Sequence, residues 1–570
     1  MKRNAFALSV AAAIGAFGLA GVATAGVIAG GSFNITGSAG PTAGTTRAVG
    51  ANALVPGQFK IGHILLGEYF TTQNGNATML HITNTDQVNG KAVKVRFRSA
   101  VNSDDVFDFT VLMSPGDMWT GGIVADEATG RSKMITADTS CTLPPVVNGE
   151  LFPTDRLPSS KTDAQKASMT REGYIEVLNM ANIPSDKVAL GKEVYDSNRD
   201  SAGKTGALYR ATKHSAGKPT CDSAVINTLR TNPTDMQAAA DMGLDLPTGT
   251  LFANVNIVNV PNTASYANQA AAVVAVATAA GASNTGNIVF YPQIGGDAGN
   301  VDAATSDPLL RQSAVLNSGK LALSPAALPL IKAQWFDLPD LSTPYISGLA
   351  PAPATPQDAP LDQAFRLPAA MNSTNVINEF NVDPSLAGAT DWVFSMPTRR
   401  YHVAMDYDHA GRGLTGFDGR VFTSTTVAAG ADTTSATPNV FNTQFNATNT
   451  ALDTDKIKIC VNSAGITMFD REETTKTSGF VISPGTASTV RFCGETSVLS
   501  FNLDGSTADP SVLGSKETLQ IIGTPYTAGW AALATAGNGS PVIGSAYMRL
   551  TNAGARAGVS GNYGLVYPHR

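Results

Sequence analysis

Charged residues are scarce in this chain, because Asp, Glu, Lys and Arg make up only 15% of its 570 residues and the formal net charge is −6. No basic stripe is present, and a protein that binds nucleic acid needs one, so nucleic acid is not an expected partner. Aromatic residues are also few, and the tryptophans are far apart in the sequence: Trp119, Trp335, Trp392 and Trp530. Scattered tryptophans favour core positions over a sugar-binding platform on one exposed face.

The sequence contains none of the motifs sought that are characteristic of a particular enzymatic reaction. The six histidines include no HExxH pattern, and the GxSxG pattern of a nucleophile elbow does not occur. Segment 201–206 (SAGKTG) contains both SxxK and KTG, but the two overlap and cannot face each other across a substrate. Two groups of acids are interpreted as turn residues instead of a hydrolytic pair: Asp104, Asp105 and Asp108, and Asp504 and Asp509. We therefore expect no enzyme and no cofactor, with a secreted hydrolase as the weakest alternative.

The first 25 residues have the parts of a secretory signal peptide. Lys2 and Arg3 form a basic start, residues 5–22 are apolar and uncharged, and residues 23–25 (ATA) form a small-residue cleavage site. Cleavage before Gly26 predicts a secreted protein that is extracellular or attached to the cell surface. Its charge would then fall from −6 to −8, because both basic residues at the start are lost.

Only four cysteines are present, and they cluster as one pair in each half of the chain. An exported chain favours disulfides, and four cysteines allow three pairings. The clustering favours Cys141–Cys221 and Cys460–Cys493. A zinc site would need CxxC-type spacing, which is absent.

Glycine and proline are abundant, with 55 and 31 residues, and this composition is typical of short strands joined by many turns. The clearest strand patterns of the first half are residues 79–85, 91–98, 106–113, 174–180 and 251–260. Residues 91–98 (KAVKVRFR) alternate, which predicts one face on the core and one in water. A second series of short strands runs from residue 376 to 550 and is typical of a sandwich.

The fold predicted is mainly β, with two β-sandwich-like domains and helical insertions. The divisions are a signal peptide 1–25, a Gly/Ala/Thr-rich leader 26–57, an N-terminal domain 58–346, a Pro/Ala-rich linker 347–363 and a C-terminal domain 364–570. Residues 181–250 form the expected insertion and carry Cys221. Helices are also expected at 264–281 and 305–334. The first of these is mostly alanine and too weakly apolar to span a membrane, so we expect no transmembrane segment after signal cleavage.

The leader has two interpretations. It is either a flexible tether or, because residues 26–36 are β-prone and uncharged, a strand that pairs with a neighbouring subunit. A second candidate site is the D-x-N-x-D pattern of Asp196, Asn198 and Asp200, whose oxygens suit calcium. The glycine and glutamate that complete an EF-hand loop are replaced by Ser201 and Ala207, so we interpret the pattern as a weak calcium site or a solvated loop.

Several phrases, read in order, resemble a family of exported proteobacterial proteins known as cell surface proteins. They include KAVKVRFRSAVNSDDVFDFTVLMSPGDMWTG (91–121), LFANVNIVNV (251–260), TDWVFSMPTRRYHV (390–403) and NYGLVYPHR (562–570). The resemblance implies a surface location and a structural role, with no catalytic residues to carry over. We therefore expect a protein that assembles with itself into a surface layer, filament or matrix. The alternative is an adhesin or carbohydrate-binding protein whose partner is a cell-surface polysaccharide.

Overall fold

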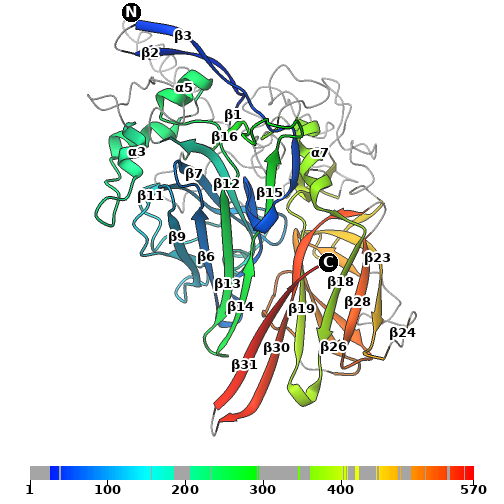
Figure 1. The fold of residues 1–570 in the computed structure, drawn as a ribbon. Coiled ribbons are helices and arrows are strands. Elements are labelled where there is room, and N and C mark those ends of the chain that lie inside the picture. Colours follow the sequence, from blue (N-terminus) through cyan, green and yellow to red (C-terminus); the bar gives the residue numbers. More distant parts are fainter. Residues whose placement is uncertain are drawn as a thin grey trace, which may run out of the picture.

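The protein is mainly β, as expected, and the computed structural model shows its strands gathered into two lobes (Figure 1). The structure describes residues 26–184, 206–293, 345–346, 360–407, 418–422, 445–476 and 490–570, apart from short gaps inside these ranges. We call residues 26–293 the N-terminal lobe and residues 360–570 the C-terminal lobe. Each lobe contains two larger sheets, an arrangement compatible with the two sandwich-like domains predicted.

The N-terminal lobe is built on a five-stranded and a seven-stranded sheet. The first has the order β10 (Ser132–Ile135), β9 (Met118–Ala125), β6 (Asn76–Asn84), β13 (Leu251–Asn259) and β14 (Ala264–Gln269). The second has the order β11 (Cys141–Leu143), β8 (Asp105–Met113), β7 (Gly90–Ser99), β12 (Glu172–Ile183), β5 (Ile64–Thr71), β15 (Ala271–Val276) and β4 (Ala53–Pro56). Leu80 and Ile82 of β6 share one buried cluster with Val93 and Val95 of β7, so the core lies between the two sheets.

The C-terminal lobe repeats this plan. One sheet has the order β27 (Leu519–Thr524), β26 (Thr496–Leu503), β19 (Ala389–Ser395), β30 (Ile543–Arg556) and β31 (Val559–Pro568). The other has the order β18 (Asn375–Asn381), β28 (Ala528–Thr535), β23 (Ile459–Phe469) and β22 (Thr450–Leu452), with β24 (Thr475–Lys476) and β25 (Arg491–Cys493) also paired to β23. Trp392, Phe380 and Phe501 are among the buried residues between them.

Short elements complete the described chain. Two small sheets pair β17 (Asn372–Ser373) with β29 (Ser540–Pro541) and β20 (Val403–Met405) with β21 (Arg420–Phe422). The α-helices are α2 (Asp163–Met169), α3 (Ala207–Thr212), α4 (Ser223–Ile226), α5 (Met236–Asp241) and α7 (Pro360–Met371). The 3-10 turns are η1 (Gln58–Lys60), η2 (Gln73–Gly75), η3 (Asn227–Arg230), η6 (Pro384–Leu386) and η7 (Arg399–Tyr401). Helices α3 to α5 agree with the helical insertion predicted within 181–250.

The helix predicted at 264–281 is wrong. This segment instead forms β14, whose first residues alternate between buried and exposed, and β15, which pairs with β4 and β5. Its alanines suggested a helix, but Val273, Val274 and Val276 are β-branched and pack against the neighbouring strands. The other helix predicted, at 305–334, lies outside the described residues, as does most of the linker 347–363.

The water-facing side predicted for residues 91–98 is also wrong. Lys94, Arg96 and Arg98 lie on one face of β7, as the alternation indicates, but all three are fully buried. Their contacts are with other buried groups: Asp108 and Gln293 for Lys94, the ring of Tyr291 for Arg96, and Glu176 for Arg98. Alternation shows which side chains share a face, but it does not show that a residue 199 positions away, Gln293, covers that face.

The leader is built into the fold at both ends. β1 (Gly26–Ile28) pairs with β16 (Ile288–Phe290), and Val27 and Ile28 are buried. β4, near the other end, pairs with β15. Between them β2 (Gly31–Gly37) and β3 (Gly40–Arg47) pair only with each other among the described strands, as a hairpin. Gly26–Ile28 is therefore neither a loose tether nor, in this structure, a strand left for a neighbour.

The two lobes share a buried interface. One apolar cluster contains Tyr69 and Tyr266 of the N-terminal lobe together with Val393 and Tyr547 of the C-terminal lobe. Edge strands β14 and β31 lie close together as well, because a Cβ on Gly564 would lie 2.0 Å from the carbonyl oxygen of Ser265. Only glycine permits that approach. The lobes therefore pack against one another as parts of a single body.

Candidate functional sites

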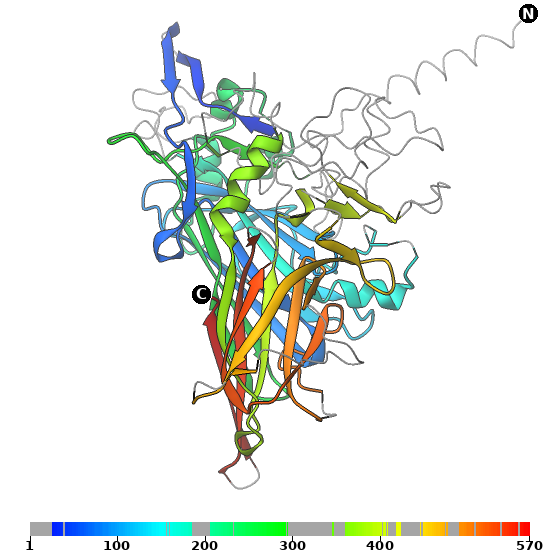
Figure 2. The same cartoon turned by 90° about the vertical axis from the view of Figure 1, so that its right-hand side faces the viewer.

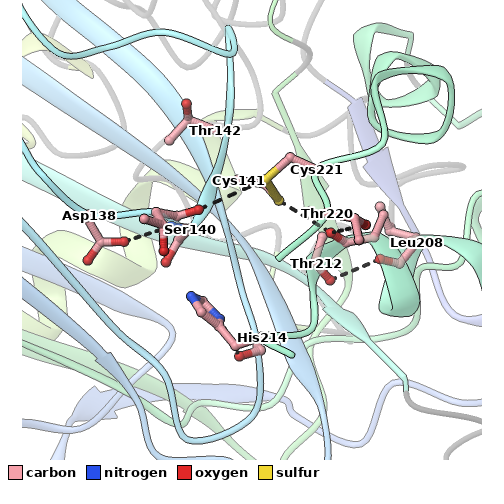
Figure 3. Close-up of a disulfide and its surroundings, with 12 residues drawn as sticks. Asp138, Ser140, Cys141, Thr142, Leu208, Thr212, His214, Thr220 and Cys221 are labelled. Atoms are coloured by element: carbon pink, nitrogen blue, oxygen red, sulfur yellow. Dashed lines mark hydrogen bonds between the residues drawn. A yellow bond between two sulfur atoms is a disulfide. The ribbon is translucent and has the colours of Figure 1, made fainter. Parts of the chain in front are cut away.

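Both cysteine pairs lie at bonding distance, in the pairing predicted. Cys141 of β11 and Cys221, just before α4, have an S–S distance of 2.14 Å and join the strand to the helical insertion (Figure 3). Cys460 of β23 and Cys493 of β25 are direct cross-strand partners with an S–S distance of 2.09 Å. Each bridge therefore lies within one lobe, the arrangement inferred from the clustering in the sequence.

The calcium candidate cannot be placed. Asp196, Asn198 and Asp200 lie outside the described residues, so calcium binding there stays a prediction. Among the residues that the structure describes, no group of three or more His, Cys, Asp or Glu side chains is arranged to hold a metal ion.

A cavity of about 600 Å³ lies where the lobes meet, and a buried acid reaches it. Strands β5, β13, β14 and β15 contribute one side, and β30 and β31 the other. Its polar lining is rich in amides and includes one cation: Asn254, Asn256, Asn268 and Gln269, with Lys60, Glu68, Ser545 and His569. The Glu68 carboxylate accepts hydrogen bonds from the Asn268 amide at 2.7 Å and from the Tyr547 hydroxyl at 3.0 Å.

The environment of Glu68 makes it a proton-binding group near neutral pH. Burial raises the pKa of Glu68 to about 7, although hydrogen bonds from Ser545, Tyr547 and Asn268 and the charge of Lys60 oppose the rise. Burial lowers the pKa of His569, on the same cavity, to about 3, so this imidazole is neutral. Glu68 is the only acid among the described lining residues, whereas glycoside hydrolysis uses two carboxyl groups. This cavity can hold or release one proton, but it lacks the second acid within that lining.

Glu68 was not singled out from the sequence. It is the one charged residue in residues 64–71 (ILLGEYFT), and a lone acid in an apolar strand is a usable signal. Its partners lie 200 and 479 positions away, so no local pattern could have supplied them.

The aspartates considered in the sequence as a hydrolytic pair do not line the cavity beside Glu68. Asp105 and Asp108 lie within β8, so the interpretation of these two acids as turn residues is wrong. Asp108 contacts Lys94 at 2.6 Å, and Asp105 lies 3.9 Å from Arg98, so both acids belong to the buried charge network on β7 and β8. Asp104 accepts a hydrogen bond from the Tyr407 hydroxyl at 3.0 Å. Asp504 is exposed in a turn, as interpreted from the sequence, and the exposed Asp509 accepts a hydrogen bond from the backbone N–H of Ser511.

The tryptophans differ in exposure. Trp119 and Trp392 are fully buried in the cores of their lobes, as expected, and Trp335 lies outside the described residues. Trp530 on β28 is 38% exposed and stacks on Phe469 of β23, with ring centroids 4.0 Å apart and planes 7° apart. This flat aromatic pair lies on the C-terminal lobe, on the sheet that contains β18.

The β2–β3 hairpin projects from the body at the end away from the β30–β31 hairpin (Figures 1 and 2). Its base is held where Gly31 pairs with Arg47, whose guanidinium forms an ion pair with buried Asp245. Residues 31–46 contain no charged side chain. The hairpin is therefore attached at its base, and β2 also lies against α5, but among the described strands β2 and β3 pair only with each other.

Among the described residues, none of the helices has the length and apolar character needed to cross a membrane. Comparison with protein-family models, with curated proteins and with solved structures finds no match to this chain. Its function must therefore be inferred from its own residues and geometry.

Proposed function

We propose that this chain is an exported, non-enzymatic structural protein of the cell surface that assembles with copies of itself into a layer, filament or matrix. The observation that carries the proposal is the projecting β2–β3 hairpin. Exposed strand edges pair readily with other strands, and proteins commonly use charged residues to prevent this. Residues 31–46 carry no such charge. The signal-peptide pattern and the resemblance to exported surface proteins support the location.

Strand addition between subunits would be the means of assembly. Backbone hydrogen bonds supply affinity in that mode and do not need a hydrophobic groove. The antiparallel pairing of β1 with β16 and the Arg47–Asp245 ion pair would transmit a pulling force on the hairpin from a neighbouring subunit to the N-terminal lobe. Those contacts distinguish the hairpin from a loose tail.

Deleting residues 32–46, so that Gly31 is joined to Arg47, tests this proposal. The two residues are register partners, so the peptide bond that joins them makes them the two central residues of a tight turn at the base of the hairpin. We expect a folded monomer with unchanged far-UV circular dichroism that no longer sediments as an assembly and shows no ordered arrays by electron microscopy.

The matched control shortens another edge hairpin, by replacing the β9–β10 turn at residues 126–131 with Asn-Gly. That variant should assemble like the native protein. Ordered assembly that persists without residues 32–46 would overturn the role of the hairpin.

A second candidate function, a carbohydrate-binding surface protein, is favoured by the exposed Trp530–Phe469 stack. Aromatic rings of this kind present flat apolar area with little conformational freedom to lose. We expect Trp530→Ala to abolish retention on purified cell-surface polysaccharide, while Tyr563→Ala, at another exposed aromatic on β31, leaves it unchanged. Equal retention of both variants and the native protein would exclude this surface.

A further inference from the structure

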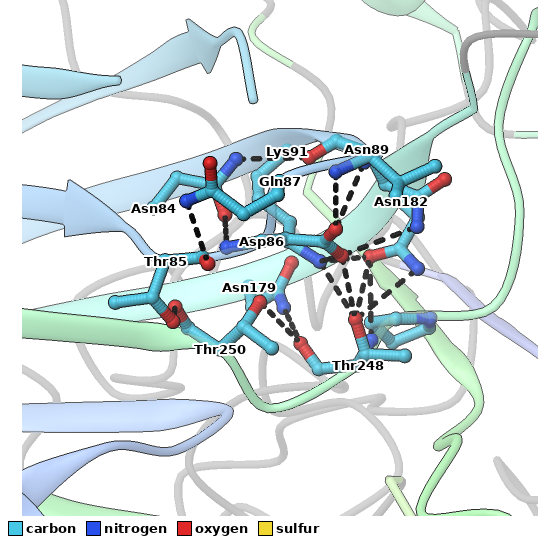
Figure 4. A network of polar contacts seen from close by, with 12 residues as sticks. Asn84, Thr85, Asp86, Gln87, Asn89, Lys91, Asn179, Asn182, Thr248 and Thr250 are labelled. Carbon is cyan, nitrogen blue, oxygen red and sulfur yellow. Dashed lines mark hydrogen bonds and ion pairs between the residues drawn. The ribbon is translucent and has the colours of Figure 1, made fainter. Parts of the chain in front are cut away.

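A lysine ammonium and an asparagine amide meet inside the seven-stranded sheet of the N-terminal lobe. Lys91 on β7 and Asn182 on β12 are direct partners in the antiparallel register, so their side chains share one face. Lys91 is fully buried, and Asn182 is 5% exposed. The Lys91 Nζ atom lies 2.5 Å from Asn182 Oδ1 (Figure 4).

Two further groups complete this cluster. Asp86 Oδ2 lies 3.0 Å from Lys91 Nζ, and the Thr248 hydroxyl oxygen lies 2.7 Å from the same atom. Thr248 is also 3.3 Å from both Asp86 Oδ2 and Asn182 Oδ1, so one hydroxyl can contact the acid and the amide oxygen. An amine, an amide carbonyl, a carboxylate and a hydroxyl therefore converge at one place, where Lys91 and Asn182 are buried and Asp86 and Thr248 are half-buried.

This set contains the groups that amide exchange requires. An amine attacks a carbonyl only when it is neutral, and it needs a nearby group to take its proton. Burial lowers the pKa of Lys91 to about 8, although the Asp86 charge opposes the shift. Burial acts to raise the pKa of Asp86, but Lys91 and the backbone N–H groups of Asn89 and Val88 outweigh it and hold this pKa at about 2. Asp86 is therefore a carboxylate in contact with the amine that must lose a proton.

We propose that Lys91 and Asn182 become joined by an intramolecular amide bond once the chain has folded, with Asp86 moving the proton. Asp86 takes a proton from the Lys91 ammonium, and the neutral Nζ attacks Cγ of Asn182. Thr248 donates a hydrogen bond to the oxygen that gains negative charge. Asp86 returns the proton to Nδ2, the Cγ–Nδ2 bond breaks, and the second proton lost from Nζ leaves with the departing nitrogen as ammonium. One C–N bond forms and one breaks, so no oxidant or cofactor is needed.

The position of the bond suits a load-bearing role. β7 and β12 are neighbours within the seven-stranded sheet, and a covalent link between direct register partners would prevent them from sliding apart. The inference does not depend on the proposed function, because the bond can be measured in the isolated protein whether or not it assembles.

Mass spectrometry of the purified, reduced protein tests the proposal. We expect the intact mass to be one ammonia lower than the mass calculated for the purified chain from its first residue, which is Gly26 if the signal peptide has been removed. Digestion with trypsin should leave the bond after Lys91 uncut and release one branched peptide that joins the segments around Lys91 and Asn182. A full intact mass, with linear peptides covering both residues, would overturn the proposal without any variant.

Four variants locate the reaction. Lys91→Arg keeps the positive charge but offers no attacking amine, and Asp86→Asn removes the proton acceptor, so both should have the full mass. Asn182→Asp should still form the bond and lose water in place of ammonia. Lys133→Arg is the matched control, because Lys133 also lies on a strand and contacts Asp126 at 2.8 Å, and it should retain the ammonia loss. Loss of ammonia in Lys91→Arg would overturn the assignment to Lys91, and bond formation in Asp86→Asn would overturn the role of Asp86.

Discussion

Glu68 and Glu172 are both buried where the lobes meet, yet their partners give them different roles. Glu172 accepts hydrogen bonds from the hydroxyls of Tyr69 and Ser515 and from the backbone N–H groups of Lys516 and Glu517. These partners surround both of its oxygens. Glu68 instead has neutral side-chain donors and an open cavity beside it. Glu68 is therefore a residue through which pH can act on the interface.

We predict that Glu68→Gln removes a pH-dependent part of the protein's stability. The ordinary pKa of this carboxyl is 4.5 and burial raises it to about 7, so between these values the folded state holds a proton that the unfolded chain has released. The stabilisation that protonated Glu68 adds to the free energy of unfolding is therefore fully present below pH 4.5 and falls as the pH rises to about 7. The full shift corresponds to about 3 kcal/mol.

Chemical denaturation of both proteins from pH 5 to 8 checks this prediction. Other groups titrate in the same window, since the pKa of Asp391 is raised to about 6 and that of His63 is lowered to about 4, in both cases mainly by burial. Because both proteins contain these groups, the difference in unfolding free energy isolates Glu68. Relative to the native protein, the Glu68→Gln variant should become more stable as the pH rises, most steeply at about pH 5.8, midway between the two pKa values, and little further above about pH 7. A difference that does not change with pH would contradict the raised pKa.

At the scale of strands and helices, the sequence predicts an element correctly where the local pattern of apolar side chains agrees with their burial in the structure. Residues 79–85, 106–113 and 251–260 were predicted as strands, and they correspond to β6, β8 and β13. Their apolar and β-branched side chains fit the pleated surface of a sheet. The helix predicted at 264–281 was wrong because alanine favours a helix, and the pairing of this segment with β4 and β5 overrode that preference.

The sites were harder to predict than the strands, for a physical reason. The disulfide pairings followed from clustering along the chain, which a sequence displays directly. The cavity at Glu68 requires β5 to meet β30, and the cluster at Lys91 requires β7, β12 and the segment around Thr248 to meet. These contacts between strands that are distant in sequence are determined by how whole sheets pack against one another. Buried charges such as Lys94 show the same limit, because a charged residue in an alternating strand ordinarily faces water.

On the scale of the whole molecule, the contacts between the lobes indicate that they fold as one unit. Arg400 of the C-terminal lobe forms an ion pair with Glu176 of the N-terminal lobe at 3.0 Å, and Arg399 donates a hydrogen bond to Asn102 at 3.1 Å. All four of these residues are buried. If one lobe opened alone, these charges and polar groups would lose their partners in the lobe that stays folded, which is costly in a low-dielectric interior.

We therefore predict a single cooperative unfolding transition, and Glu172→Ala tests its origin. This truncation leaves the backbone N–H groups of Lys516 and Glu517 without their acceptor, at about 1–3 kcal/mol for each. Although the substituted residue belongs to the N-terminal lobe, we expect the whole heat-capacity peak to move to lower temperature. Glu379→Ala, an exposed acid on β18, is the control and should shift the peak little. Peptide-resolved hydrogen exchange should show both lobes losing protection together in Glu172→Ala. Two separate calorimetric peaks in the native protein, or weakened protection in one lobe alone, would mean that the buried contacts hold the lobes in place without coupling their folding.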